Sequence, residues 1–353
     1  MLNSHDPPFR AGHSFAALRS TMCCLGALLP GLMAGCGGGD ADTVAPDANQ
    51  VTCPAGWNTS TFFRTVTPAQ IAACLDAGES VRAKTTDGET PLHLAASYTD
   101  DPAVIRALID AGASLDSRNS ENHTVLCVAV IRNENPAVIQ ALIDGGAITS
   151  DSCGPGLPTQ PGPTPLHWAV GENANPDVAE VLIRAGADIN CRPLNGRTPL
   201  ENAALLQDNP AMLELLISYG ADLGGVTRYA ALNENPEIIR VVIAAGASLS
   251  WGLHSSIRNR NTAITQILIE AGADLNEGVV TDTREGIIEG TTPLHFAVRF
   301  PDPNLEAVEA LLEAGADPNI QDGSGRTPLD WVPQGVQSSV AELLRRYGGR
   351  TSG

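Results

Sequence analysis

The stretch Thr90-Pro91-Leu92-His93-Leu94-Ala95 returns almost unchanged twice, as TPLHWA at residues 164–169 and as TPLHFA at residues 292–297. Threonine accepts a hydrogen bond at a helix N-cap, and proline fits the first helical turn because its missing N–H would have no partner there. Each copy therefore predicts the start of an α-helix. Shorter versions of the same opening lie at Thr124, Thr198 and Thr327.

A glycine that ends a helix follows these openings at a nearly constant distance. The spacing is 22 residues from Thr90 to Gly112 and again from Thr124 to Gly146, whereas the connection from each glycine to the next threonine varies. Glycine ends helices because it enters the left-handed conformation without steric cost. Constant blocks joined by unequal connectors predict a rigid unit that repeats along the chain. The glycines are Gly78, Gly112, Gly146, Gly186, Gly220, Gly246, Gly272, Gly315 and Gly348.

Each block contains a second helix start. A proline such as Pro102 or Pro136 stands 12 residues after the opening threonine, and an N-cap residue such as Asp101 or Asn135 precedes it. Apolar residues at helical spacing follow. Each block is therefore predicted to be a helical hairpin, and connectors with turn sequences such as Asp87-Gly88-Glu89 are predicted to be hairpin loops.

The three TPLH sequences resemble the signature of the ankyrin repeat family. The resemblance covers about residues 57–348. It implies an all-α repeat solenoid of stacked helix-turn-helix units with β-hairpin fingers, about eight repeats plus a partial N-terminal unit, and a concave binding face. The corresponding repeat domain is 53–349, followed by a tail at 350–353.

The stretch 221–272 departs from this pattern. Counting back 22 residues from its two glycines places the first helices of two units at Gly224 and Ser250, which leaves only 4 residues for each preceding connector. We therefore expect two units without fingers, flanked by the enlarged connectors 147–163 and 273–291. This gap is either a recognition feature or neutral variation, since loop length costs little stability.

The first 35 residues have the pattern of an export signal. An apolar run from Met22 to Ala34 is too short to span a bilayer and fits a signal peptide at 1–35. It ends at Cys36 in a sequence that resembles a bacterial lipobox, which implies lipidation of Cys36 and a flexible tether over 36–52. The resemblance implies a lipoprotein of the bacterial cell envelope, anchored in the outer membrane and facing the periplasm. The alternative is an ordinary signal peptide cut nearby.

Five cysteines remain after the signal peptide and the lipidation site are set aside. Cys53 and Cys74 flank the incomplete first unit, and a disulfide between them would hold the N-terminal end of the repeats in an exported protein. Cys153 and Cys191 lie in consecutive connectors and are a second candidate pair. Cys127 replaces the histidine of its unit inside a helix, so we expect a buried free thiol.

The chain carries 40 acidic and 21 basic residues, a formal net charge of −19. Such a charge repels phosphate backbones, so we expect no nucleic-acid partner and no membrane contact beyond the lipid anchor. The charge either keeps an exposed repeat array soluble or attracts a basic protein. Aromatic residues make up only 4% of the chain, which indicates a core of small aliphatic side chains.

No stretch of the sequence matches a catalytic or phosphate-binding motif. His93, His167 and His295 occupy the same position in different units, at least one helix diameter apart, whereas zinc ligands converge within about 2 Å of the metal. The resemblance gives these histidines hydrogen bonds to nearby backbone and threonine hydroxyls. We therefore expect no enzyme activity, no cofactor and no metal site.

We expect a monomer that binds a protein partner through its concave face and finger loops, with a surface formed before binding. A second hypothesis is a dedicated chaperone, inhibitor or protective factor for an exported enzyme, and an enzyme is a third. Glycosylation sequons at Asn58 and Asn122 keep a eukaryotic secreted source open. The contact residues implied by the resemblance are Glu89, Ser97, Tyr98, Arg132, Glu172, Arg197, Arg299 and Phe300.

Overall fold

α-Helices follow one another in pairs from Val51 to Gly353 in the computed structural model. The predicted signal peptide, Cys36 and Phe300 lie outside the residues that the structure describes. The described residues are 51–150, 152–153, 162–173, 175–193, 196–279, 289–299, 304–332 and 339–353.

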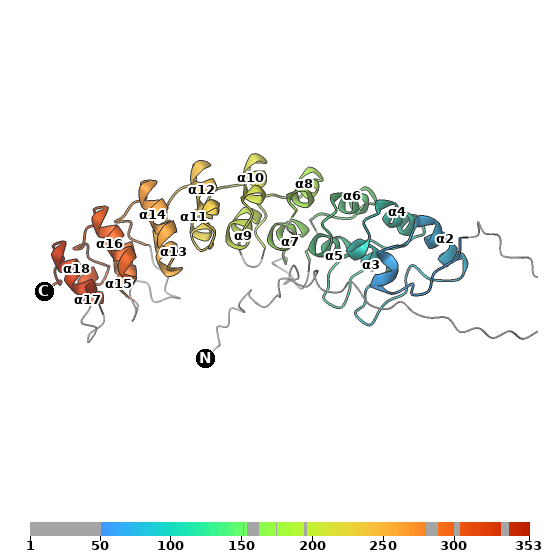
Figure 1. The fold of residues 1–353 in the computed structure, drawn as a ribbon, viewed down its shortest axis with the longest axis horizontal. Helices are drawn as coiled ribbons and strands as arrows, with labels where there is room; N and C mark the ends of the chain where they lie inside the picture. The colour runs from blue at the N-terminus through green and yellow to red at the C-terminus, as the bar shows by residue number, and fades with distance from the viewer. Residues whose placement is uncertain are drawn as a thin grey trace, which may run out of the picture. The chain divides into compact units, whose positions relative to one another are not determined.

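The 18 helices of this part of the chain form two rows (Figure 1). In both rows each helix contacts the corresponding helix of the next pair. The first-helix row consists of α1 (Ser60–Phe63), α3 (Pro91–Tyr98), α5 (Val125–Arg132), α7 (Pro165–Glu172), α9 (Pro199–Leu206), α11 (Val226–Ala230), α13 (Gly252–Arg258), α15 (Pro293–Val298) and α17 (Pro328–Trp331). The second-helix row consists of α2 (Pro68–Asp76), α4 (Pro102–Asp110), α6 (Pro136–Asp144), α8 (Pro176–Arg184), α10 (Pro210–Ser218), α12 (Pro236–Ala244), α14 (Thr262–Glu270), α16 (Leu305–Glu313) and α18 (Ser339–Arg346).

The helices begin and end where the sequence places capping residues. Thr90 is the N-cap of α3, and Asn135 caps α6 by accepting a hydrogen bond from the N–H of Ala137. Gly112 follows α4 with a φ of 85°, in the left-handed region. The helices from α3 to α18 make eight pairs, and α1 with α2 makes the partial N-terminal unit. The predicted all-α repeat solenoid is therefore confirmed.

Buried amides join the carboxyl ends of successive first helices. The Nδ2 of Asn133 donates to the carbonyls of Ala96 and Thr99 in the preceding repeat, at 3.0 and 2.8 Å. Buried carbonyls need such partners, so the amides hold neighbouring repeats in register. The same bond to the preceding repeat is made by Asn173, Gln207, Asn233 and Asn259.

The described parts of the connectors between repeats contain no extended hairpin. An isolated bridge closes two of them, Arg118 with Thr124 and Val279 with Thr291, and the described residues contain no longer strand. In the loop 119–123 the turn follows directly after the single bridged pair, so this finger is short.

Two connectors have no finger. Residues 219–225 join α10 to α11, and residues 245–251 join α12 to α13. These first helices begin after Gly225 and Trp251, one residue later than the spacing predicts. Both N-caps have a left-handed backbone, with φ of 77° and 65°. The prediction was wrong by one residue because it assumed the 22-residue spacing of the other units, whereas these two N-caps lie 21 residues before Gly246 and Gly272.

Both ends of the repeat array are covered by side chains or backbone. At the N-terminal end, the rings of Trp57 and Phe62 pack edge to face with centroids 5.6 Å apart. At the other end, the hydroxyl of Thr327 donates to the carbonyl of Arg350 at 2.6 Å. The segment predicted as a tail therefore begins with a residue that packs on the last repeat, as a terminal cap requires.

Candidate binding surface

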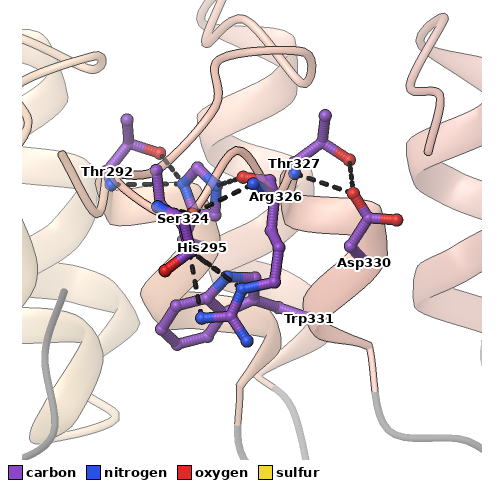
Figure 2. Close-up of polar contacts among 8 residues, drawn as sticks. Thr292, His295, Ser324, Arg326, Thr327, Asp330 and Trp331 are labelled. Atoms are coloured by element: carbon purple, nitrogen blue, oxygen red, sulfur yellow. Dashed lines mark hydrogen bonds and ion pairs between the residues drawn. The ribbon is translucent and has the colours of Figure 1, made fainter. Parts of the chain in front are cut away.

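A histidine at the third residue of a first helix bonds both to the N-cap of its own helix and to the next repeat. The N–H of Thr90 donates to Nδ1 of His93 at 3.2 Å. A ring nitrogen that accepts an N–H is unprotonated, so the proton is assigned to Nε2, which faces the carbonyl of His123 at 3.4 Å. Figure 2 shows the same arrangement in a later repeat, where His295 reaches the carbonyl of Arg326 at 2.9 Å.

Burial keeps these imidazoles neutral. Desolvation lowers the pKa of His93 from 6.5 to about 4, and burial also lowers the pKa of His167 and His295. A neutral ring can accept at one nitrogen and donate at the other, as both hydrogen bonds require. The histidines therefore link repeats. In the part of the chain that the structure describes, no group of three or more His, Cys, Asp or Glu side chains could hold a metal ion.

A carboxylate takes the histidine position in two other repeats. The N–H of Thr198 donates to Glu201 at 2.9 Å, and the N–H of Thr327 donates to Asp330 at 2.9 Å, as Figure 2 shows for the second pair. Glu201 is buried, and the guanidinium of Arg192 donates to both of its oxygens, at 2.9 and 3.0 Å. This forked pair compensates the charge that burial would otherwise disfavour.

The described residues contain two disulfides, and one differs from the prediction. Cys53 is bonded to Cys74, which ties the N-terminal segment to α2. Cys153 is bonded to Cys127, and Cys191 is a free thiol. The suggested pairing of Cys153 with Cys191 is therefore wrong, as is the expectation that Cys127 is free.

Cys127 pairs with Cys153 because of the direction in which its side chain points. Cys127 stands at the helix position that a histidine takes in other repeats. The third residue of a first helix points to the connector that leads into the next repeat, as His93 does. Cys153 lies in that connector, and its N–H donates to the carbonyl of Pro163, directly before the next N-cap Thr164, at 2.7 Å. The disulfide therefore replaces the histidine bond between these two repeats.

Three of the predicted contact residues are engaged within the array. The guanidinium of Arg132 lies 2.7 Å from a carboxylate oxygen of Glu89, which is 7% exposed. Ser97 is 5% exposed, and its hydroxyl donates to the carbonyl of His93 at 2.9 Å. Ser97 is therefore held inside the array in this structure, because α3 packs between α1 and α5.

The remaining described contact residues reach the surface. Glu172 is exposed at the end of α7, while Tyr98, Arg197 and Arg299 are half-buried. Each of these three side chains stacks on a side chain of a neighbouring repeat.

Four arginine–aromatic pairs bridge successive repeats along the first-helix row. Each guanidinium lies over an aromatic ring of the following repeat, 5.0 to 5.8 Å from the ring centroid. Such stacks contribute about 0.5–1 kcal/mol each at exposed sites. These pairs were not predicted, although an arginine followed by an aromatic residue one repeat later is their signal in the sequence. The pairs are Arg64–Tyr98, Arg197–Tyr229, Arg228–Trp251 and Arg299–Trp331.

Among the described residues, the free thiol of Cys191 does not suit nucleophilic chemistry. Burial, followed by the charge of Asp188, raises the pKa of the Cys191 thiol, so it is protonated at neutral pH. None of the helices in the described ranges is long and apolar enough to cross a membrane.

A family model described as "Ankyrin repeats (3 copies)" matches residues 68–152, 131–225 and 228–322. Human "Neurogenic locus notch homolog protein 4" is 49% identical over 57 residues, which is 16% of this chain and 3% of that protein. Pig "NF-kappa-B inhibitor alpha" is 48% identical over 58 residues, 16% of this chain and 18% of that protein. Mouse "ARF GTPase-activating protein GIT2" is 43% identical over 56 residues, which is 16% of this chain and 8% of that protein. The chain therefore spans less than a fifth of the length of each of these relatives.

Proposed function

Because the chain belongs to the ankyrin repeat family, whose repeats generally mediate contacts between proteins, we propose that it binds a protein partner through its first-helix row and connectors. The observation that carries this proposal is the series of half-exposed arginine–aromatic pairs along that row. Arginine, tyrosine and tryptophan are the residues that contribute most to protein interfaces. Bonds between repeats hold these side chains before a partner arrives, so binding costs little ordering.

Site-specific crosslinking in cells tests this function. A photoreactive residue at Glu172 or Arg299, on the first-helix side, should capture one defined protein. The matched control is Glu214, an exposed residue of α10 in the second-helix row, which should capture nothing specific. Equal capture from all three positions, or from none, would rule out recognition by this surface.

We also propose that a lipid on Cys36 tethers the protein, as a monomer, to the bacterial envelope. The support is the export signal and lipobox-like sequence of residues 1–36, together with the Asp- and Gly-containing tether after it. A Cys36→Ser variant should leave the membrane fraction, while a Cys24→Ser variant should remain in it. Retention of the Cys36→Ser protein in the membrane fraction would exclude the lipid anchor.

A narrower role as an inhibitor or protective factor for an exported enzyme has one observation in its favour. The pig relative matched over 58 residues is itself named an inhibitor. Under this alternative, the captured partner is a single enzyme that copurifies in equal amount and changes activity when the two separate. Capture of several unrelated proteins would favour a general scaffold instead.

A further inference from the structure

Two neighbouring first helices carry positive charge in a strongly acidic chain. We call residues 224–233 and 250–261 the fingerless segments, because no finger precedes either one. They contain Arg228, Arg258 and Arg260 and no aspartate or glutamate, although the chain has 40 acidic residues. The missing fingers are one source of this difference, since other fingers carry acidic residues.

The tryptophan in the second fingerless segment occupies a backbone conformation that favours glycine. Trp251 is the N-cap of α13 with a φ of 65°, and the matching N-cap of α11 is Gly225 with a φ of 77°. A bulky residue in this conformation is strained, and such strained residues cluster at functional sites. Trp251 is half-buried, and Arg228 lies over its ring at 5.4 Å.

The stacked side chains continue into the preceding repeat. Tyr229 is adjacent to Arg228 on α11, and Arg197 lies over its ring at 5.8 Å. Arginines and aromatic rings thus alternate from the connector before α9 to the start of α13. We call Arg197, Arg228, Tyr229 and Trp251 the arginine–aromatic strip.

Two carboxylates near this strip already accept backbone hydrogen bonds. Asp222 accepts from the N–H of Gly224 at 2.9 Å, and Glu277 accepts from the N–H of Trp251 at 3.1 Å. Each of these bonds lies at the N-cap of a fingerless helix or directly before it. The two arginines of the strip stack on rings, and a stacked guanidinium keeps its N–H groups at the edge of the plane, where they can donate to a carboxylate.

We propose that the arginine–aromatic strip binds an acidic segment of the protein partner. This inference rests on the proposed function and names the chemistry of the partner. The guanidinium groups would bind carboxylates, and the faces of Tyr229 and Trp251 would take apolar side chains between them. The net charge of −19 repels acidic ligands elsewhere on the chain, so recognition depends on this local charge.

The probe is a fluorescently labelled acidic peptide of alternating Glu, Ala and Tyr. Its binding to the full chain is measured by fluorescence anisotropy at two salt concentrations. Arg228→Glu should weaken binding by about tenfold or more, because it reverses a charge in the strip. Arg240→Glu makes the same change on α12, in the second-helix row, and should leave binding unchanged. Equal affinity of both variants, or tighter binding of a matched Lys, Ala and Tyr peptide, would overturn the proposal.

Trp251→Gly separates binding from folding. Gly225 shows that a fingerless helix can begin from glycine, so the melting temperature should not fall by more than a few degrees, while the peptide affinity should fall several-fold. A loss of stability without any loss of peptide affinity would show that Trp251 only supports the repeat, and the strip would lose its apolar half.

Two further comparisons distinguish other outcomes. Replacing Asp40, Asp42 and Asp47 by asparagine should not change peptide affinity; a marked rise would show that the chain's own acidic tether occupies the strip, contrary to the proposal. If crosslinking from Arg299 captures a partner that Arg228→Glu binds normally, the acidic-segment inference fails while the proposed function stands. If no partner is captured from any position, the proposed function fails.

Discussion

The third residue of the first helix shows how one side chain can serve two repeats. His93 accepts from its own N-cap through Nδ1 and faces the carbonyl of His123 through Nε2. In two other repeats a carboxylate, that of Glu201 or Asp330, accepts the hydrogen bond from the N–H of the N-cap threonine. The sequence analysis predicted a structural role for the histidines. It did not predict the bond to the next repeat, because that bond joins residues 30 positions apart.

At the residue scale, acid should weaken the fold through His93. Its pKa is about 4 in the folded chain and 6.5 when exposed. Between these two values the unfolded chain binds more protons than the folded chain, so the free energy of unfolding decreases as the pH is lowered. The full loss, reached below the folded pKa, is about 3 kcal/mol. His93→Gln copies the cap that Gln70 makes with Thr67 and should lack this dependence.

Urea denaturation of both proteins between pH 7 and pH 4.5 measures this effect. The difference in unfolding free energy between wild type and His93→Gln should shrink as the pH falls, while effects of the many surface carboxylates cancel. A difference that stays constant over this range would contradict a neutral, buried His93.

At the scale of elements, the starts and ends of helices follow from residues next to one another in sequence. Threonine caps, prolines after them and terminal glycines lie where predicted, as for Thr90, Pro91 and Gly112. The starts after Gly225 and Trp251 were missed by one residue, because a left-handed N-cap without a capping side chain has no sequence signature.

Asn133→Ala should destabilise the stacking of α3 and α5. The change removes the donor for two buried carbonyls, Ala96 and Thr99, and leaves both without a partner. An unpaired buried polar group costs about 1–3 kcal/mol, so we expect a loss of about 2 kcal/mol or more in urea denaturation. Gln140→Ala, at an exposed position of α6, is the control and should stay within about 0.5 kcal/mol of wild type.

The enlarged connector can be shortened without disturbing the repeat if Val279 is kept. Val279 is buried and its N–H donates to the carbonyl of Thr291 at 3.1 Å, so the pair closes the loop. Replacing residues 280–288 by three residues copies the loop 119–123, which joins the bridged pair Arg118 and Thr124. The melting temperature should change by less than about 2 °C.

If this connector contributes to recognition, the shortened protein should bind its crosslinking partner at least several-fold more weakly. Unchanged affinity would show that the enlargement is neutral variation. A large drop in melting temperature would instead show that the connector supports the repeats.

At the scale of the whole molecule, each repeat packs on its neighbours, so the ends of the array depend on special contacts. The Cys53–Cys74 disulfide and the packing of Trp57 on Phe62 hold the N-terminal unit, whose first helix has only 4 residues. In a repeat array, stability is approximately a sum over units and their interfaces, so a weak terminal unit can open alone.

Removal of that disulfide should therefore loosen the N-terminal end first. The double variant Cys53→Ala with Cys74→Ala should lose about 3 kcal/mol, the expectation for a loop of this length. Hydrogen exchange should rise in α1 and α2 before it rises in α9 and α10. The control is Cys191→Ser, which replaces a free thiol and should leave hydrogen exchange unaltered. An equal rise of exchange in all helices of the double variant would contradict independent opening of the N-terminal end.

The sequence by itself determined the repeat, its two helices and their caps, because these depend on contacts within a few residues and on a constant spacing. Only the tertiary structure decided which side chains meet across repeats: Cys127 with Cys153, Asn133 with Ala96, and each arginine with the aromatic ring beyond it. Those partners depend on side-chain direction and on the length of each connector. Neither can be read from periodicity, since a repeat pattern places residues along the chain but does not orient them toward a neighbour.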